Sequence, residues 1–274
     1  MKFPLLAALA VAGAGAAGLA YARYIEPGRF EITRLELALP GLPPAFDGYR
    51  IVHLSDLHYD GVMNERRMAE VAAHVRAARP DLVAFTGDFV TAHVSFDADE
   101  LVRFLRALDA PDGVLAVLGN HDHVGHTRTL RAALAEAGVI ELANCVQTVR
   151  RGDATLHLAG VDSLYWRKAR LDRVTEALPD DGAPVILLAH EPDLADLAAP
   201  LGCFALQLSG HAHGGQISLG GLTALGLPAH GRRYVSGLYL TGRMFVYANR
   251  GLGTTSAPLR FNCRPEIAVI TLRA

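Results

Sequence analysis

The stretch at 50–58, Arg-Ile-Val-His-Leu-Ser-Asp-Leu-His, decides the fold class, because a short aliphatic run ends in polar and ionisable side chains. Short runs rich in aliphatic and β-branched residues are typical of buried strands, and we expect strands at 50–55, 82–86 and 114–118. Segments with apolar residues at helical spacing lie between or after these runs, at 64–79, 98–108 and 127–137. Strands that alternate with helices predict an α/β domain.

The second half of the chain contains more strand-like runs and fewer helical segments. Runs of this kind occur at 155–159, 185–189, 204–208, 244–248 and 267–272. Strands follow one another with few helices from 139 to 161 and again from 204 onward. This pattern predicts an added antiparallel or mixed sheet.

Length and composition limit the architecture and the partners. The chain has 274 residues, 51% of them apolar, which is enough for one sizeable core or two modest ones. We expect one domain over residues 49–274 and an N-terminal appendage. The net charge of −2 creates no basic field of the kind that draws proteins onto nucleic acids. DNA and RNA are therefore not expected partners.

Residues 1–24 form the N-terminal appendage. No charged residue occurs at 3–22, and Lys2 and Arg23 flank this stretch. Its length is about that of a helix that crosses the hydrocarbon core of a membrane. Residues 20–22 also form an A-x-A pattern of the kind that signal peptidases cleave. We therefore expect a hydrophobic N-terminal helix that is a membrane anchor, with a cleaved export signal as the alternative.

Ionisable and amide side chains gather where the predicted strands end. In open α/β sheets, ligands bind in the crevice beyond the carboxyl ends of the strands. Five separate strands deliver such side chains to this edge. The side chains delivered by these strands are Asp56, His58, Asp88, Asn120, His121, His190, His211 and His213.

These residue types indicate a metal site. Asp56 and His58 are two residues apart, so both side chains can face one ion, and the same spacing separates His211 and His213. Asp88 has two carboxylate oxygens and can bridge two ions. Oxygen and nitrogen donors without thiolates favour Zn, Mn or Fe.

The number of candidate ligands suggests two ions. Apart from His121, the gathered residues supply seven ligands, which are too many for one tetrahedral ion and sufficient for a pair. Paired ions serve phosphatases and nucleases, where they bind phosphoryl oxygens and convert a bridging water to hydroxide near neutral pH. The sequence therefore predicts a hydrolase of phosphate esters with two divalent metal ions per chain.

The order of these motifs resembles that of the calcineurin-like metallophosphoesterase superfamily. The chain contains D-x-H, G-D, G-N-H-D, a lone histidine and G-H-x-H in that order, and the resemblance spans residues 49–274. It is most similar to a bacterial membrane-associated or exported branch (YkuE- or YaeI-like), as indicated by segments 211–216, 250–253 and 265–267. The resemblance implies a two-sheet β-sandwich flanked by helices, in α/β/β/α layers.

The resemblance also implies a role for each motif residue. Asp56, His58, Asp88 and His213 correspond to ligands of the first metal, and Asp88, Asn120, His190 and His211 to ligands of the second. His121 corresponds to the acid that protonates the leaving oxygen, or to a cation that faces the phosphate. Relatives of the protein-phosphatase branch orient this histidine with an acidic residue three positions after the G-D aspartate. Here that position is Thr91, and Asp122 or another group is the candidate replacement.

We therefore expect a phosphohydrolase at a bacterial cell membrane, held by a single N-terminal anchor or exported after signal cleavage. The expected substrate is a phosphodiester or a diphosphate, on a phosphorylated small molecule, a membrane lipid or a nucleotide-lipid. One alternative is a phosphomonoesterase of broad specificity. Another is a metal-binding scaffold without catalytic activity.

Overall fold

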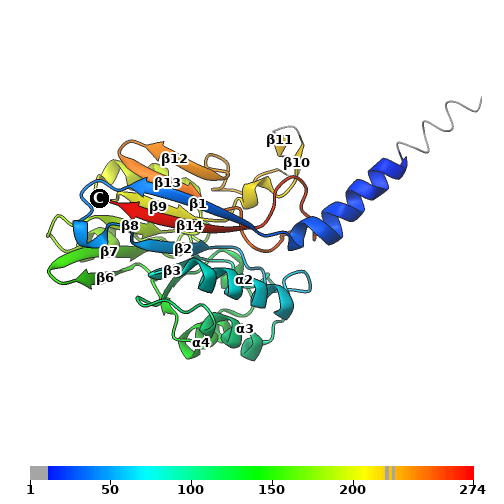
Figure 1. Ribbon diagram of the computed structural model, residues 1–274, viewed down its shortest axis with the longest axis horizontal. Coiled ribbons are helices and arrows are strands. Elements are labelled where there is room, and N and C mark those ends of the chain that lie inside the picture. Colours follow the sequence, from blue (N-terminus) through cyan, green and yellow to red (C-terminus); the bar gives the residue numbers. More distant parts are fainter. Residues whose placement is uncertain (1–11, 220–221, 224–225) are drawn as a thin grey trace, which may run out of the picture.

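The computed structural model describes residues 12–219, 222–223 and 226–274, and its main feature is a pair of mixed sheets that pack face to face (Figure 1). The first sheet has the order β1 (Glu31–Ala38), β14 (Glu266–Arg273), β2 (Arg50–Leu54), β3 (Leu82–Thr86), β4 (Val114–Val117) and β5 (Ile140–Glu141). The second has the order β12 (Gly237–Thr241), β13 (Met244–Ala248), β9 (Leu206–Ser209), β8 (Val185–Leu188), β7 (Ala154–Gly160) and β6 (Cys145–Arg151). A separate small sheet consists of β10 (Ser218–Leu219) and β11 (Leu222–Thr223), which pair antiparallel.

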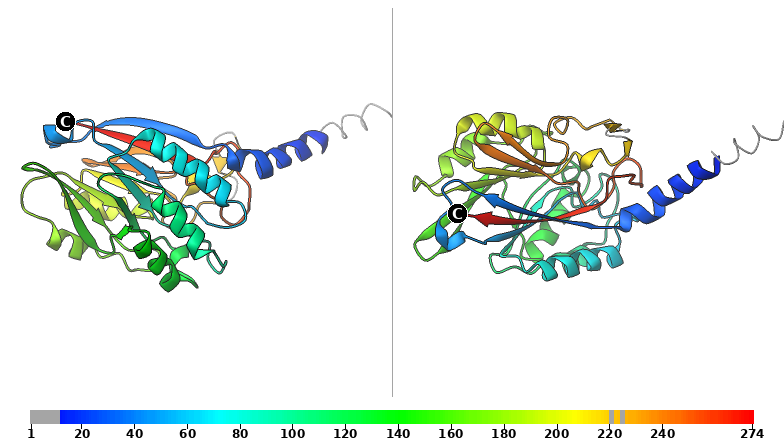
Figure 2. Two further views of the ribbon diagram at one scale, coloured as in Figure 1. Left: turned by 60° about the horizontal axis from the view of Figure 1, so that its bottom comes forward. Right: turned by 45° about the horizontal axis from the view of Figure 1, so that its top comes forward.

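Helices cover the outer faces of both sheets (Figure 2). The first sheet carries α2 (Glu65–Ala78), α3 (Ala98–Arg106) and α4 (Thr127–Glu136), and the second carries α5 (Leu171–Ala177) and α6 (Ala195–Ala198). Short 3₁₀ turns lie in the connections, namely η3 (Pro44–Phe46), η4 (His121–His123), η5 (Pro192–Leu194), η6 (Ala199–Leu201) and η7 (His213–Gly215).

Three clusters of buried apolar side chains define the layers. One lies between α2, α3, α4 and the first sheet, the second between the two sheets, and the third between the second sheet and its short helices. Alternation along β2 explains why one strand serves two clusters, since Val52 and Leu54 face the helices and Ile51 faces the other sheet. The structure thus confirms two mixed sheets flanked by helices.

The strand directions decide where the loops meet. β2, β3 and β4 run parallel in the first sheet, and β7, β8, β9 and β13 run parallel in the second. The carboxyl ends of parallel neighbours lie at one edge, so the segments that follow them are brought together. The first sheet also begins before residue 49, because β1 pairs with β14 along its whole length.

The described part of the chain begins with a helix that projects from the domain (Figure 1). Residues 12–20 are α-helical. A π-helical turn, η1 (Tyr21–Ile25), and a 3₁₀ turn, η2 (Glu26–Gly28), follow this helix and lead to β1. Within the described part of the chain, no helix has both the length and the apolar character needed to cross a membrane. Residues 1–11 of the predicted hydrophobic helix lie outside the described residues.

A histidine side chain is fully buried within the first sheet. His53 on β2 has no exposed surface, and its Nε2 lies 2.8 Å from the Thr86 hydroxyl oxygen. Its Nδ1 has no hydrogen-bond partner in the described structure. Burial lowers the pKa of His53 to about 4, from an ordinary value of 6.5.

We predict that His53 makes the metal-free protein sensitive to acid. Between pH 6.5 and pH 4 the unfolded chain protonates this residue and the folded chain does not, so the free energy of unfolding falls as the pH falls, by up to about 3 kcal/mol. Denaturant unfolding across this range should show a shallower fall for His53→Gln. The exposed His74→Gln is the control, and parallel curves for the wild type and His53→Gln would contradict the assignment.

Candidate metal centre

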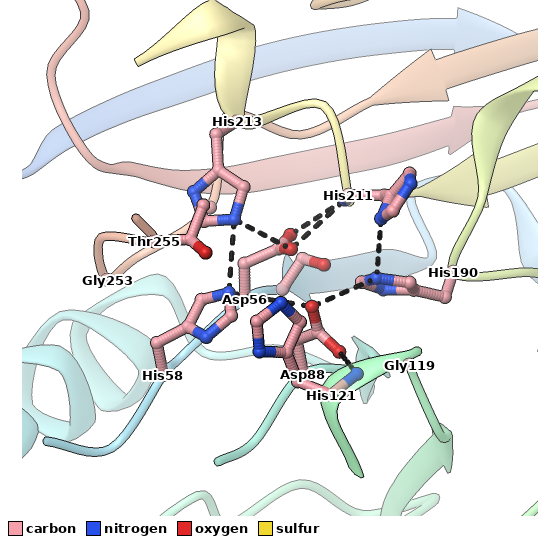
Figure 3. Close-up of polar contacts among 12 residues, drawn as sticks. Asp56, His58, Asp88, Gly119, His121, His190, His211, His213, Gly253 and Thr255 are labelled. Atoms are coloured by element: carbon pink, nitrogen blue, oxygen red, sulfur yellow. Dashed lines mark hydrogen bonds and ion pairs between the residues drawn. The ribbon is translucent and has the colours of Figure 1, made fainter. Parts of the chain in front are cut away.

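The eight side chains expected at the site come together at one edge of the sandwich (Figure 3). They lie in the segments that follow β2, β3, β4, β8 and β9. Six of them are almost completely buried, with exposed fractions of 0% to 5%, namely Asp56, His58, Asp88, His190, His211 and His213. Asn120 and His121 are partly exposed and face a cavity above the others.

Asp56, His58 and His213 form the first metal-binding group. The Nε2 atoms of the two histidines lie 3.1 Å apart, and Nε2 of His213 lies 3.2 Å from Oδ1 of Asp56. One donor atom from each residue lies within 4.8 Å of the other two. Such convergence of nitrogen and carboxylate donors is suited to a single cation.

Asp88, His190 and His211 form the second metal-binding group. Nε2 of His190 lies 3.2 Å from Oδ2 of Asp88 and 3.1 Å from Nδ1 of His211. The amide oxygen Oδ1 of Asn120 lies 3.1 Å from the same nitrogen, so it offers a fourth donor.

The Asp88 carboxylate joins the two groups. Its Oδ2 lies 3.5 Å from Nε2 of His58 in the first group and 3.2 Å from Nε2 of His190 in the second. Its Oδ1 accepts a hydrogen bond from the backbone N–H of His121, which fixes the carboxylate plane. This is the position that a bridging ligand requires.

Hydrogen bonds behind the histidines point selected ring nitrogens into the site. Nδ1 of His190 donates to the backbone carbonyl of Thr86 at 2.7 Å, and Nε2 of His211 donates to that of Ala229 at 2.8 Å. The other nitrogen of each ring therefore faces the group, where it can bind a metal ion once it carries no proton. Partners of this kind set the tautomer and the orientation of metal-binding histidines.

The backbone at the site adopts a conformation that side chains disfavour. Five of the grouped residues have positive φ, from 43° to 66°, namely Asp56, His58, Asp88, His211 and His213. A left-handed conformation costs of order 1 to 3 kcal/mol for a residue other than glycine, and it persists only where the surroundings enforce it. Such outliers cluster at functional sites, and here they turn each side chain inward as its segment leaves the strand.

The two buried carboxylates of the site are ionised and are stabilised by positive charge near them. Burial alone would raise the pKa of the Asp56 carboxyl, but the adjacent His213 outweighs burial and holds that pKa low. Burial would likewise raise the pKa of Asp88, and His190 lowers it. Although burial lowers the pKa of His190, Asp88 raises it well above its ordinary value. Without metal, a proton on His190 therefore supplies positive charge beside the Asp88 carboxylate, and a divalent cation bound by the same donors would take the place of that proton.

His121 is held by the backbone rather than by an acid. Its Nδ1 accepts a hydrogen bond from the N–H of Ala92 at 3.1 Å, so the ring proton of the neutral form resides on Nε2. Asp122 accepts instead from the N–H groups of Gly119 and Val90, and burial raises its pKa to about 8. The interpretation of Asp122 as the residue that orients His121 is therefore wrong.

A cavity of about 630 Å³ opens above the two groups. Its floor contains Asp88, His121 and His213, and its walls contain residues that the sequence did not point to, namely Tyr165, Gly226, Leu227, Pro228, Ala229, Thr255, Ser256 and Ala257. These wall residues come from loops without periodic patterns, so no spacing rule could have found them.

Comparison with known proteins agrees with this geometry. Residues 49–215 match the pattern of the family described as Calcineurin-like phosphoesterase. The chain is 37% identical to the metallophosphoesterase YkuE of Bacillus subtilis (strain 168), covering 99% of this chain and 95% of YkuE. It is 30% identical to the phosphodiesterase YaeI of Escherichia coli (strain K12), covering 97% of each. It is 27% identical to the UDP-2,3-diacylglucosamine pyrophosphatase LpxG of Chlamydia muridarum (strain MoPn / Nigg), covering 91% of each.

The chain therefore belongs to the calcineurin-like phosphoesterase family. It is a metallophosphoesterase, and hence a hydrolase. The resemblance noted from the order of the sequence motifs is confirmed.

We predict that Asp88→Asn removes at least one of two bound metal ions, because the amide has no charge to share between the groups. Its NH₂ group must also replace either the oxygen that accepts from the His121 N–H or the oxygen that faces both groups. Turnover should fall by about 10³-fold, the equivalent of several kcal/mol in the barrier. Elemental analysis of the purified protein measures the metal, with the exposed Asp172→Asn as the control. An Asp88→Asn protein that keeps two ions would refute the bridging position.

Proposed function

We propose that this chain is a binuclear metal-dependent phosphohydrolase that cleaves phosphodiester or diphosphate bonds on substrates with an apolar portion. The observation that carries the proposal is the Asp88 carboxylate, which lies between two groups of buried donors. A single ion needs no such shared ligand. Paired ions are typical of hydrolases that act on phosphate esters.

Seven residues would hold the ions, with Asp88 shared between them. The first ion would take Asp56, His58, Asp88 and His213, and the second Asp88, Asn120, His190 and His211. Ions bound there supply charge that binds phosphoryl oxygens and activates water as the nucleophile. The metal is Mn, Zn or Fe, because the donors are carboxylate, amide and imidazole.

His121 acts on the leaving group. In hydrolysis the water oxygen forms a bond to phosphorus, the bond from phosphorus to the leaving oxygen breaks, and that oxygen then needs a proton. Because Ala92 holds the His121 ring through Nδ1, the N–H at Nε2 is available to the leaving oxygen. His121 lines the cavity, and its ring contacts that of His58 edge to face, with centroids 4.8 Å apart.

The cavity walls support a substrate that carries an organic group. Leu227, Pro228 and Ala229 offer an apolar wall above the phosphate position, and Tyr165 adds an aromatic ring that is 45% exposed. LpxG is named for the hydrolysis of UDP-2,3-diacylglucosamine and YaeI for phosphodiester hydrolysis. A lipid or nucleotide-lipid substrate is consistent with both the cavity and these relatives.

The N-terminal segment supports a place at a bacterial cell membrane. The described helix is exposed along 12–20, and Leu19, Tyr24 and Ile25 present large apolar surfaces beside Arg23. Aromatic and basic residues are enriched at the membrane interface. Recovery of the full-length chain only in the soluble fraction, with its N-terminus intact, would contradict this location.

We predict that the purified full-length protein hydrolyses a phosphodiester and a nucleotide-diphosphate lipid. The value of kcat/KM for these substrates should be at least about tenfold higher than for a matched phosphomonoester, because the cavity walls extend beyond the phosphate position. Bis(p-nitrophenyl) phosphate, p-nitrophenyl phosphate and a UDP-linked lipid are suitable probes. A preference for the monoester would instead support a phosphomonoesterase of broad specificity.

We also predict that His121→Ala retains both metal ions and lowers kcat by about 10²-fold, as expected for loss of a proton donor. The loss should be larger for alkyl esters than for nitrophenyl esters, since a poor leaving oxygen depends more on the proton. Rates on a series of diesters with graded leaving groups provide the measurement. An equal loss across the series would contradict the proposed role.

A further inference from the structure

The segment between β13 and β14, residues 249–265, contains a buried cation. Arg260 has no exposed surface, and its guanidinium donates mainly to carbonyls of its own loop. Nη2 donates to Gly253 at 2.6 Å, to Arg250 at 2.8 Å and to Gly251 at 3.1 Å, and Nη1 donates to Cys263 at 3.2 Å. A buried guanidinium is stable only when its donors are satisfied, so the loop is folded around this side chain.

The folded loop presses against Asp56. The backbone N–H of Gly253 donates to the carbonyl of Asp56 at 2.7 Å. A Cβ atom added at Gly251 would lie 2.7 Å from Cβ of Asp56, so the backbone approaches this ligand more closely than a side chain would permit. The loop therefore supports the left-handed conformation of Asp56, which has φ 50°.

The same loop contacts His213, another member of the first metal-binding group. Nη2 of Arg260 lies 3.5 Å from Nδ1 of His213, and the Cys263 thiol contacts the His213 carbonyl at 3.2 Å. Both loop residues are buried, so the outer edge of the imidazole meets the loop rather than solvent.

The second metal-binding group has other supports. His190 is held by the carbonyl of Thr86, and His211 by the carbonyl of Ala229. Asp88 is held by the backbone N–H of His121. None of these three hydrogen bonds involves residues 249–265, so the loop supports the two groups unequally.

The loop is also bound to the end of the N-terminal helix. The backbone N–H of Arg260 donates to the carbonyl of Ala22 at 2.9 Å. The backbone N–H of Cys263 donates to Oε1 of Glu26 at 2.6 Å, and Glu26 is only 1% exposed. The helix that projects from the domain thus ends on the back of the loop that supports Asp56 and His213.

We propose that Arg260 is a positioning residue for the first metal-binding group. It fixes the 249–265 loop against Asp56 and His213, so the ion held by that group depends on Arg260 and the other ion does not. Through Ala22 and Glu26, the same loop connects the N-terminal helix to the first group. This inference rests on the binuclear centre proposed above.

The test compares metal binding by the full-length wild type, Arg260→Met and Arg260→Lys. Metal-free protein is titrated with Mn²⁺ by calorimetry, and electron paramagnetic resonance distinguishes a coupled pair of ions from an isolated one. We expect two ions in the wild type. In Arg260→Met we expect one ion with unchanged affinity, one bound at least about tenfold more weakly, and the signal of an isolated ion.

Two further variants show whether metal binding depends on the guanidinium of Arg260, rather than on its charge alone or on the loss of any arginine that donates to a backbone carbonyl. Arg260→Lys should resemble Arg260→Met, because an ammonium keeps the charge but cannot reach all the carbonyls that the guanidinium fork bonds. Arg50→Met is the matched control. Arg50 also donates to a backbone carbonyl, that of Ala78 at 2.7 Å, but it lies at the amino end of β2, away from the site. Arg50→Met should keep both ions.

A folded Arg260→Met protein that binds both ions as the wild type does, or that loses both equally, overturns the proposal. If this variant does not fold, Glu26→Ala tests the same loop from the N-terminal side. We then expect a smaller weakening of one ion, and unchanged binding of both overturns the proposal. If the wild type binds two ions but hydrolyses no phosphoester, the proposed function fails and the role of Arg260 stands.

Discussion

The structure depends on the burial of two carboxylates, Asp56 and Asp88, whose described ion pairs are with histidines alone. Negative charge in a dry interior is costly unless positive charge lies close to it. In the metal-free protein a protonated His190 supplies part of that charge, and imidazoles that have lost this proton supply lone pairs that bind a cation. A pair of divalent ions satisfies both requirements, and this explains why so many donor atoms converge where solvent hardly reaches.

Both sheets contribute residues to this centre. The first sheet contributes the residues after β2, β3 and β4, and the second contributes those after β8 and β9. The apolar cluster between the sheets therefore sets the separation of the donors. Several hydrogen bonds cross this boundary, among them those from His190 to the Thr86 carbonyl and from the backbone N–H of His211 to the Asp56 carboxylate. The packing that stabilises the core between the sheets thus also sets the distances between the donor atoms of the site.

The sequence predicted the strands that end at the site and the motifs that follow them. Both can be recognised from neighbouring residues alone, because each strand is a short aliphatic run and each motif is a group of polar residues directly after it. It missed β1, an edge strand in which charged residues interrupt the alternation of apolar and polar side chains. It also missed the hydrogen bond from Ala92 that supports His121 and the hydrogen bonds from Arg260 that support the 249–265 loop. These supports use backbone N–H and carbonyl groups, which every residue has, so only the folded chain reveals them.

The central claim is that two ions share Asp88. Crystals grown with Mn²⁺ and measured at the manganese absorption edge test it most directly. We expect two anomalous peaks, one bound by Asp56, His58 and His213, the other by Asn120, His190 and His211, with Asp88 bound to both. A single peak, or two peaks of which only one contacts Asp88, would contradict it.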